Sequence, residues 1–304
     1  MALIKRIFLF LAINFLVILT LSSILHLFHL QSFFYSYGIN LRSLFLFCFF
    51  WGMGGSFISL CLSRFLTKWM MKVKIIKQNT LDEEKKNLLL ITDILAKRAG
   101  LSTSPEVGIY SSKEVNAFAT GPTKKKALIA VSTGLLEKLE ENEIEAIIGH
   151  EISHIANGDM VTMTLLQGVI NAFVMFLARV LAFFLSNLSR GRNNQSSYYS
   201  TRFFTFFFEI IFMVFGMMVI ASFSRWREFR ADKGGALLAG KEKMIEALKT
   251  LRIMHDIHDP LKEPARLQAF KISSRSKKGW NKLFSTHPSL EDRIERLKNL
   301  SEIC

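Results

Sequence analysis

Four long apolar stretches constrain most strongly how this chain of 304 residues can fold. They run from about Ile7 to Leu30, Ser43 to Leu62, Val161 to Leu188 and Phe203 to Phe223. A helix of about 20 apolar residues crosses the core of a bilayer, so each stretch is long enough to span a membrane. The first stretch is longer than the apolar part of a signal peptide and precedes no small-residue cleavage site, so we expect it to be retained. The sequence predicts a multi-pass α-helical membrane protein.

The charge and the composition agree with a membrane protein. Lys and Arg outnumber Asp and Glu by 39 to 25, which gives a formal net charge of +14. Such a balance suits either nucleic acid or an anionic membrane surface as a partner. Because 28 Phe residues and the apolar stretches call for surrounding lipid, we expect the lipid bilayer as a partner and no nucleic acid. Three cysteines without paired spacing indicate no disulfide framework.

The basic residues beside the first two stretches predict their orientation. Lys5 and Arg6 precede the first stretch, and only Arg42 lies between the two. Five basic residues and no acid follow the second stretch: Arg64, Lys68, Lys72, Lys74 and Lys77. Because basic residues favour the cytoplasmic side, we expect both ends of this hairpin, and the soluble block after it, to face the cytoplasm.

The chain is expected to have four parts. Residues 1–62 form two N-terminal transmembrane helices, 63–159 the first half of a catalytic domain, 160–224 a hydrophobic hairpin of two transmembrane helices, and 225–304 the second half of the domain. The loop of the later hairpin carries basic residues and no acid: Arg190, Arg192 and Arg202. If both stretches span the membrane, this loop lies on the side opposite the cytoplasm, where basic residues are disfavoured. Partial insertion of this hairpin is therefore an alternative.

The sequence of the soluble parts predicts a mixture of α-helices and β-strands. Thr80 to Glu83 matches a capping box and predicts a helix that ends at Gly100, and Asn142 predicts the start of a second helix. Three short strands are expected between these helices: Glu106–Tyr110, Asn116–Thr120 and Ala127–Val131. Three helices are expected after the last apolar stretch: Trp226–Leu238, Lys241–Ile257 and one from Ser289. Residues 259–285 are expected to form a loop between the last two.

The run His150-Glu151-Ile152-Ser153-His154 is an HExxH pattern on the second predicted helix. Residues four apart on a helix share a face, so both imidazoles can reach one ion with Glu151 beside them. Zinc held in this way makes its water more acidic, and a neighbouring carboxylate can take the proton. The pattern predicts that one Zn²⁺ per chain is bound by His150 and His154, with Glu151 as the general base.

A catalytic zinc needs a third protein ligand. Asn157 and Met160 occupy the positions that a third histidine with an intervening glycine would require, which closes that possibility. Glu228 and Asp232 are again four apart on a predicted helix, so Glu228 is the better candidate and Asp232 can orient a ligand imidazole. An even number of apolar stretches separates His154 from Glu228, so the two halves of the site can meet on one side of the membrane.

These residues resemble a known family, the HtpX-type membrane zinc peptidases, which are related to the prenyl-protein (CAAX) endopeptidases. The resemblance rests on the two N-terminal apolar stretches and four motifs: 116–121 (NAFATG), 150–159 (HEISHIANGD), 228–232 (EFRAD) and 286–288 (THP). It implies a cytoplasmic α+β zincin-like (gluzincin) catalytic domain in a bacterial inner (cell) membrane. It also implies cleavage of protein or peptide substrates, in particular misfolded or damaged membrane proteins, during envelope stress.

The resemblance further implies roles for individual residues. Zinc would be bound by His150, His154 and Glu228, with Glu151 as the base. His287 and Arg293 would lie near the site and stabilise the oxyanion or hold Asp232. Residues Asn116, Ala117, Phe118 and Ala119 would form an edge strand that pairs with extended substrate.

The sequence also offers alternatives to this interpretation. A non-enzymatic membrane assembly or transport protein with a decoy metal motif is the alternative function. An intramembrane protease is disfavoured because acidic residues crowd the segment before His150. Residues 235–242 approach a phosphate-binding loop, but Glu242 stands where a Ser or Thr is needed. Arg179 and Glu209, at similar depth in two apolar stretches, are expected to form a structural ion pair.

Overall fold

The computed structural model describes residues 40–188, 194–257 and 283–300. The chain divides into two compact units, Met1–Ile58 with Thr162–Val219 and Ser59–Val161 with Ile220–Cys304. The first predicted apolar stretch and most of the predicted 259–285 loop lie outside the described residues.

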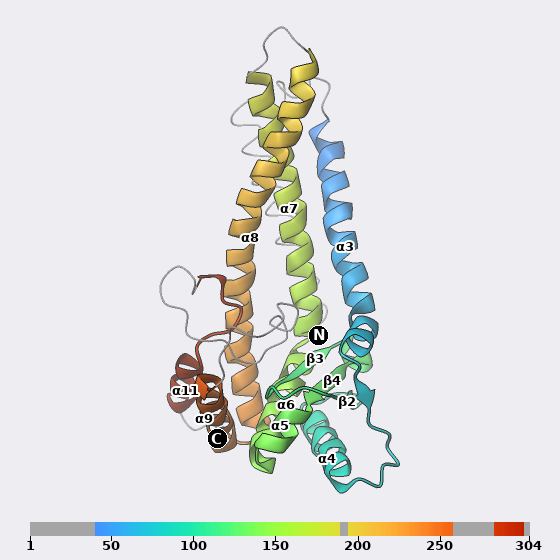
Figure 1. Cartoon of the computed structure of the whole chain (residues 1–304), viewed down its shortest axis with the longest axis vertical. Helices are drawn as coiled ribbons and strands as arrows, with labels where there is room; N and C mark the ends of the chain where they lie inside the picture. The colour runs from blue at the N-terminus through green and yellow to red at the C-terminus, as the bar shows by residue number, and fades with distance from the viewer. Residues whose placement is uncertain (1–39, 189–193, 258–282, 301–304) are drawn as a thin grey trace. The chain divides into compact units, whose positions relative to one another are not determined.

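Three helices are long and apolar enough to cross a membrane among the described residues: α3 (Leu41–Met70), α7 (Asp159–Leu188) and α8 (Asn194–Ala239) (Figure 1). They contain the second, third and fourth apolar stretches, which are therefore helical as predicted and are three candidate membrane spans. Their composition explains the match: the runs are rich in Phe, Leu, Ile and Val, and because lipid offers no hydrogen bonds to the backbone, a helix is the form that satisfies it. The described helices therefore supply a membrane-spanning part.

Small residues bring α3 and α7 together in the first unit. A Cβ added to Gly52 would lie only 2.6 Å from the backbone nitrogen of Ala172, so glycine is required at this contact. Ser56, four residues later, is also buried. The predicted ion pair is present as well, with 2.9 Å between Arg179 Nη1 and Glu209 Oε1. Close backbone contact and a paired charge are typical of helices packed within a membrane.

The second unit contains a four-stranded sheet in the order β1-β2-β4-β3. The strands are β1 (Lys74–Ile75), β2 (Glu106–Tyr110), β3 (Ala117–Thr120) and β4 (Leu128–Ser132). β2 and β4 are parallel, whereas β1 and β3 run antiparallel to their neighbours. The three predicted strands are confirmed to within one residue. β1 was not predicted, because a strand of two exposed residues has no hydrophobic alternation to detect.

Two predicted helix N-caps were wrong, each by two residues. α4 (Glu83–Arg98) is capped by Asp82 rather than Thr80, since the Asp82 carboxylate accepts a hydrogen bond from the Lys85 backbone. α6 (Glu141–Asn157) is capped by Glu140 rather than Asn142. In α6 the capping box is made by Glu140 and Glu143, each of whose side chains accepts a hydrogen bond from the other's backbone N–H.

The helices after the last apolar stretch were predicted with one error. α9 (Lys241–Ile257) and α11 (Leu290–Lys298), which Ser289 caps, agree with the prediction. The predicted Trp226–Leu238 helix is not separate, because α8 continues without a break to Ala239. It ends there since Gly240 adopts a φ of +114°, which favours glycine. The short helix α5 (Thr133–Lys138) was not predicted.

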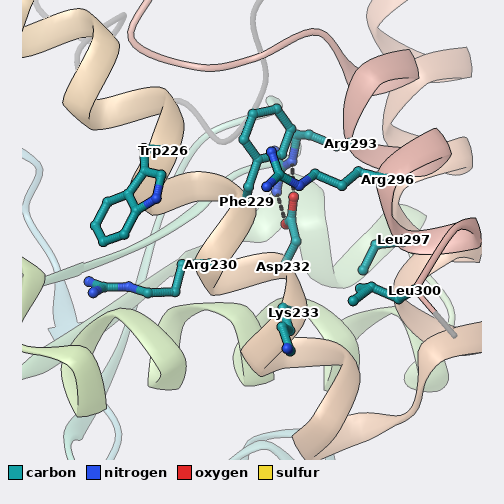
Figure 2. Close-up of a pocket in the computed structure, with 9 residues that line it drawn as sticks. All are labelled: Trp226, Phe229, Arg230, Asp232, Lys233, Arg293, Arg296, Leu297 and Leu300. Atoms are coloured by element: carbon teal, nitrogen blue, oxygen red, sulfur yellow. Dashed lines mark hydrogen bonds and ion pairs between the residues drawn. The ribbon is translucent and has the colours of Figure 1, made fainter. Parts of the chain in front are cut away.

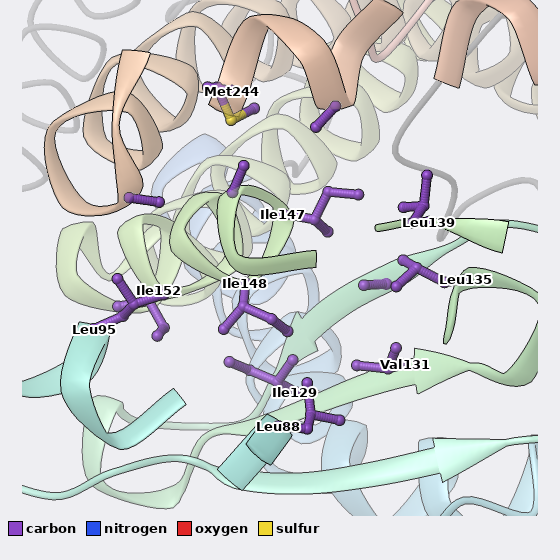
Figure 3. Close-up of a cluster of buried hydrophobic side chains, with 14 of the residues drawn as sticks. Leu88, Leu95, Ile129, Val131, Leu135, Leu139, Ile147, Ile148, Ile152 and Met244 are labelled. Atoms are coloured by element: carbon purple, nitrogen blue, oxygen red, sulfur yellow. The ribbon is translucent and has the colours of Figure 1, made fainter. Parts of the chain in front are cut away.

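The core of the second unit lies between α6 and the sheet. Figure 3 shows Ile148 and Ile152 of α6 beside Ile129 and Val131 of β4, with Leu88 and Leu95 from α4 closing one side. Met244 of α9 covers the opposite side of α6. Because α6 is buried by apolar neighbours on most sides, the position of its remaining polar face is fixed by packing.

Candidate metal centre

The polar face of α6 carries both histidines of the HExxH run. His150 and His154 are one helical turn apart, with ring centroids 4.7 Å apart, and their side chains are only 2% and 8% exposed. The helix surrounds them with isoleucines that pack into the core. Two buried imidazoles on one rigid helix are therefore held close together before any ligand binds.

Glycines allow α8 to approach this face of α6. A Cβ on Gly234 would lie 2.0 Å from Ser153 Oγ and 2.7 Å from Ser153 Cβ. A Cβ on Gly235 would lie 3.0 Å from the backbone nitrogen of His150, and one on Gly149 would be 3.4 Å from the Gly235 carbonyl oxygen. Side chains at Gly234 and Gly235 would separate the helices, so these two glycines permit the contact that brings α8 carboxylates to the histidines, whereas a Cβ at Gly149 would make an ordinary contact.

Glu228 of α8 faces both imidazoles. Its carboxylate oxygens lie 3.6 Å from His150 Nε2 and 3.4 Å from His154 Nε2. Two ligand atoms that are each 2.0–2.1 Å from a tetrahedral ion lie about 3.4 Å apart, so these separations suit zinc. The structure thus brings together the three residues proposed as ligands, and their ligand atoms all lie within 4.8 Å of one another.

The Glu228 carboxylate also behaves as a group that needs a cation. Both of its oxygens are buried, and neither accepts a hydrogen bond of good geometry from the described residues. Besides the two imidazoles of the HExxH run, His287 Nδ1 lies 3.0 Å and Arg227 Nη2 3.1 Å from this carboxylate. Since a buried carboxylate is costly without strong partners, a metal ion fits this donor set of two nitrogens and one carboxylate.

Each histidine is oriented by a carboxylate that is itself held by an arginine. His150 Nδ1 lies 3.0 Å from Asp232 Oδ1. His154 Nδ1 lies 2.7 Å from Asp159 Oδ2. In both histidines Nδ1 lies beside an acid and Nε2 lies toward Glu228, the arrangement expected of metal-binding histidines.

The two arginines are Arg293 and Arg230. Arg293, which is fully buried, contacts Asp232 through Nε at 2.7 Å and Nη2 at 2.5 Å. Arg230 forms an ion pair with the other acid, Asp159. The Arg293 guanidinium thus lies near the site, as the resemblance implied, and its contacts are those of a residue that holds Asp232 in place.

The field at the site favours positive charge. Burial alone would lower the pKa of His150, but the Asp232 and Glu228 carboxylates outweigh it and raise that pKa to about 9. For Arg293, burial is likewise outweighed by the Asp232 carboxylate, which raises the pKa. The acids that stabilise a proton on His150 would stabilise a divalent cation still more strongly.

Glu151 differs from the other acids of the site. It is buried, and burial raises the pKa of its carboxyl group although the neighbouring histidines oppose the shift. Within the described part of the chain its carboxylate forms no hydrogen bond or ion pair. A buried carboxylate next to a metal-binding set, with its oxygens uncommitted, is suited to accept a proton.

The proposed substrate residues lie at the edge of the sheet. β3 ends the strand order and packs against α6. Asn116 precedes the strand, and its carbonyl accepts a hydrogen bond from Ser132 N. Because hydrogen-bonded pairs alternate in an antiparallel ladder, Phe118 also faces β4, whereas the backbone groups of Ala117 and Ala119 point away from it. The described chain places no further strand there.

Three residues near the site were not singled out from the sequence: Asp159, Arg230 and Arg227. Asp159 directly follows Gly158, which ends α6 with a φ of +65° and turns the chain back toward His154. An acid just after a helix-ending glycine was a usable signal. Arg227 Nη1 lies 3.2 Å from His154 Nδ1, but an arginine in a basic helix carries no signal of its own.

Comparison with known proteins agrees with this centre. The signature of peptidase family M48 matches residues 82–301. The chain belongs to peptidase family M48. It is 45% identical to Protease HtpX of Thioalkalivibrio sulfidiphilus over 296 residues, covering 97% of this chain and 98% of that one. It is 42% identical to Protease HtpX homolog of Bacillus subtilis over 306 residues, covering 97% and 99%.

A solved structure shows a similar fold. The crystal structure of S. mikatae Ste24p matches 97% of this chain and 67% of its own, with a TM-score of 0.57 and 17% identity. The family resemblance read from the sequence motifs is therefore confirmed. As a member of family M48 with HtpX-type relatives, the chain is a membrane-bound metalloprotease, and a non-enzymatic assembly or transport protein is not favoured.

The glycine contact predicts a pair of variants. Gly234→Ala should push α8 away from α6, because the added methyl group would overlap Ser153, and should lower metal content at least tenfold. Ser153→Gly removes the side chain that would be struck, so adding it to Gly234→Ala should restore metal binding at least in part. Metal content per purified chain, by mass spectrometry, is the measurement. Equal metal content in wild type and Gly234→Ala would show that the contact does not set the site.

Proposed function

We propose that this protein is a zinc endopeptidase whose ion is bound by His150, His154 and Glu228. The observation that carries the proposal is the separation of 3.4 to 3.6 Å between the Glu228 oxygens and the two imidazole Nε2 atoms. Nitrogen and carboxylate ligands in a set of three, with one position left for water, are typical of catalytic zinc. One zinc ion per chain follows from the single cluster of this kind among the described residues.

The residues around the ligands have distinct roles in this proposal. When bound, zinc would make a water molecule acidic and polarise the scissile carbonyl group. Glu151 accepts the proton from that water as it attacks and then delivers a proton to the departing amine. Asp232 and Arg293 keep His150 in the orientation that presents Nε2, and Asp159 and Arg230 do the same for His154.

His287 is proposed as the donor to the oxyanion that forms at the carbonyl. Its imidazole is 11% exposed and lies 3.0 Å from Glu228 Oε2, so it borders the ligand set without belonging to the HExxH helix. A donor beside the metal can stabilise negative charge that develops during attack. Arg293 is assigned to Asp232 rather than to the oxyanion, because its two short contacts are both with that acid.

The substrate is proposed to bind as an extended strand along β3. The outward backbone groups of Ala117 and Ala119 can form hydrogen bonds with a peptide that continues the sheet, with Asn116 and Phe118 holding the strand from the β4 side. Protein and peptide substrates follow from the family. Misfolded or damaged membrane proteins, cut under envelope stress, are the substrate class proposed here.

The membrane arrangement is also a proposal. We infer that residues 63–159 and 225–304 form one catalytic domain on the cytoplasmic side of a bacterial inner membrane, with 1–62 and 160–224 as transmembrane hairpins. The basic residues at the C-terminal end of α3, Arg64 and Lys68, support this orientation. The second compact unit, which groups 59–161 with 220–304, supports the division.

The third ligand is tested by Glu228→Ala. Mutation of a residue that only hydrogen-bonds a metal ligand typically reduces metal affinity roughly 10–100-fold. Loss of the Glu228 ligand itself should reduce zinc affinity by more than this, while the protein stays in the membrane fraction. Glu246→Ala, at an exposed position of α9, is the matched control and should retain zinc. Full zinc content and activity in Glu228→Ala would mean that another residue is the third ligand.

The edge strand is tested by Ala117→Pro. Proline removes an outward N–H but no hydrogen bond to β4, so cleavage of an unfolded protein should fall about tenfold while zinc content stays normal. Phe118→Pro should instead lower the melting temperature, because its N–H faces β4. An Ala117→Pro variant with unchanged turnover would remove β3 as the substrate strand.

The general base is tested by comparing Glu151→Gln with His150→Ala in detergent. Gln keeps the size of the side chain but cannot accept the proton, so proteolysis should be abolished while zinc and folding survive. His150→Ala should lose both metal and activity. Metal content by mass spectrometry and turnover on an unfolded protein are measured for both. Substantial turnover by Glu151→Gln would refute the mechanism even with zinc present.

A further inference from the structure

A basic and aromatic pocket lies between α8 and α11, on the outer side of the metal centre. It has a volume of about 270 Å³. α8 contributes Trp226, Phe229, Arg230, Asp232 and Lys233, and the α11 region contributes Arg293, Arg296, Leu297 and Leu300 (Figure 2). Four cations and one carboxylate belong to this lining, so the pocket carries an excess of positive charge and attracts anions.

Two of these cations have no acidic partner among the described residues. Arg230 and Arg293 are engaged by Asp159 and Asp232, but Lys233 and Arg296 are exposed and form no ion pair with the described chain. Arg296 is nevertheless held in place, because its guanidinium carbon lies 4.5 Å from the centre of the Phe229 ring. Its N–H groups remain available around the ring face, and a fixed guanidinium is suited to a phosphate.

The apolar and aromatic residues that line the pocket indicate that the anion is part of a molecule at the membrane interface. Trp226 is 51% exposed and comes three residues after the apolar stretch of α8, where tryptophan is typical of the interface between membrane and water. Leu297 and Leu300 add apolar surface on the other side. A cavity of about 270 Å³ has room for a phosphate with its glycerol, whereas the acyl chains of a lipid would have to lie outside it.

We propose that this pocket binds the phosphate group of an anionic phospholipid headgroup, with Lys233 and Arg296 as its contacts. The acyl chains would lie outside the pocket, along the apolar surface that Trp226 borders. Basic pockets beside membrane-spanning helices bind such headgroups. Binding here does not depend on proteolysis, although Arg230 and Arg293 also belong to the proposed metal centre. Lys233 and Arg296 can therefore be changed without altering that centre.

The test uses the purified full chain in a non-ionic detergent, with lipid binding measured by native mass spectrometry. Short-chain phosphatidylglycerol should bind at least tenfold more tightly than short-chain phosphatidylcholine. The double variant Lys233→Gln/Arg296→Gln should lose this preference, since each cation near a headgroup is worth about 1 kcal/mol, or roughly fivefold in affinity. Lys125→Gln/Lys126→Gln removes the same charge at exposed positions away from the pocket and should keep the preference.

Three results would overturn the proposal. Equal loss of binding in both double variants would mean that net charge, and not the pocket, attracts the lipid. Equal binding of the two lipids by the wild type would mean that no anion is selected. Displacement of phosphatidylglycerol by an equal concentration of inorganic phosphate would assign the pocket to free phosphate. If the pocket double variant does not fold, Lys233→Gln alone, at an exposed position, should still weaken phosphatidylglycerol binding about fivefold.

Discussion

The close contact between α6 and α8 is the constraint on which the rest of the site depends. Gly234 and Gly235 let the two backbones approach until an added Cβ at Gly234 would overlap Ser153. Only at that distance can a carboxylate on α8 reach imidazoles on α6. The isoleucines on the other side of α6 fix the helix against the sheet, so the separation is set by rigid packing rather than by the polar groups themselves.

The buried charges of the site are balanced in two parallel chains of contacts. Each proceeds from an imidazole to an aspartate and from the aspartate to an arginine: His150, Asp232 and Arg293 in one, His154, Asp159 and Arg230 in the other. Burying such ions costs several kcal/mol each, and their attraction offsets this only with good geometry. An arrangement of this kind is a poor source of stability, and its use lies in orienting the two imidazoles.

The sequence predicts those features of the structure that depend on local patterns. The apolar stretches of α3, α7 and α8 were found because membrane helices need long uninterrupted runs. His150, His154, Glu228 and Asp232 were found because each pair repeats at one helical turn. Asp82 and Glu140 were missed as helix caps because several polar residues competed for each position. The ion pair between Arg230 and Asp159 could not be predicted, because the two residues are 71 positions apart and no local sequence pattern indicates their contact.

The position of β3 at the end of the sheet has a consequence for how a protease of this kind would choose its substrates. The outward groups of Ala117 and Ala119 are backbone amides and carbonyls, and every peptide offers the same groups in return. A chain already folded has these groups occupied by its own helices and strands. Recognition through this edge would therefore distinguish conformations rather than sequences: a segment becomes a substrate when it loses its native partners.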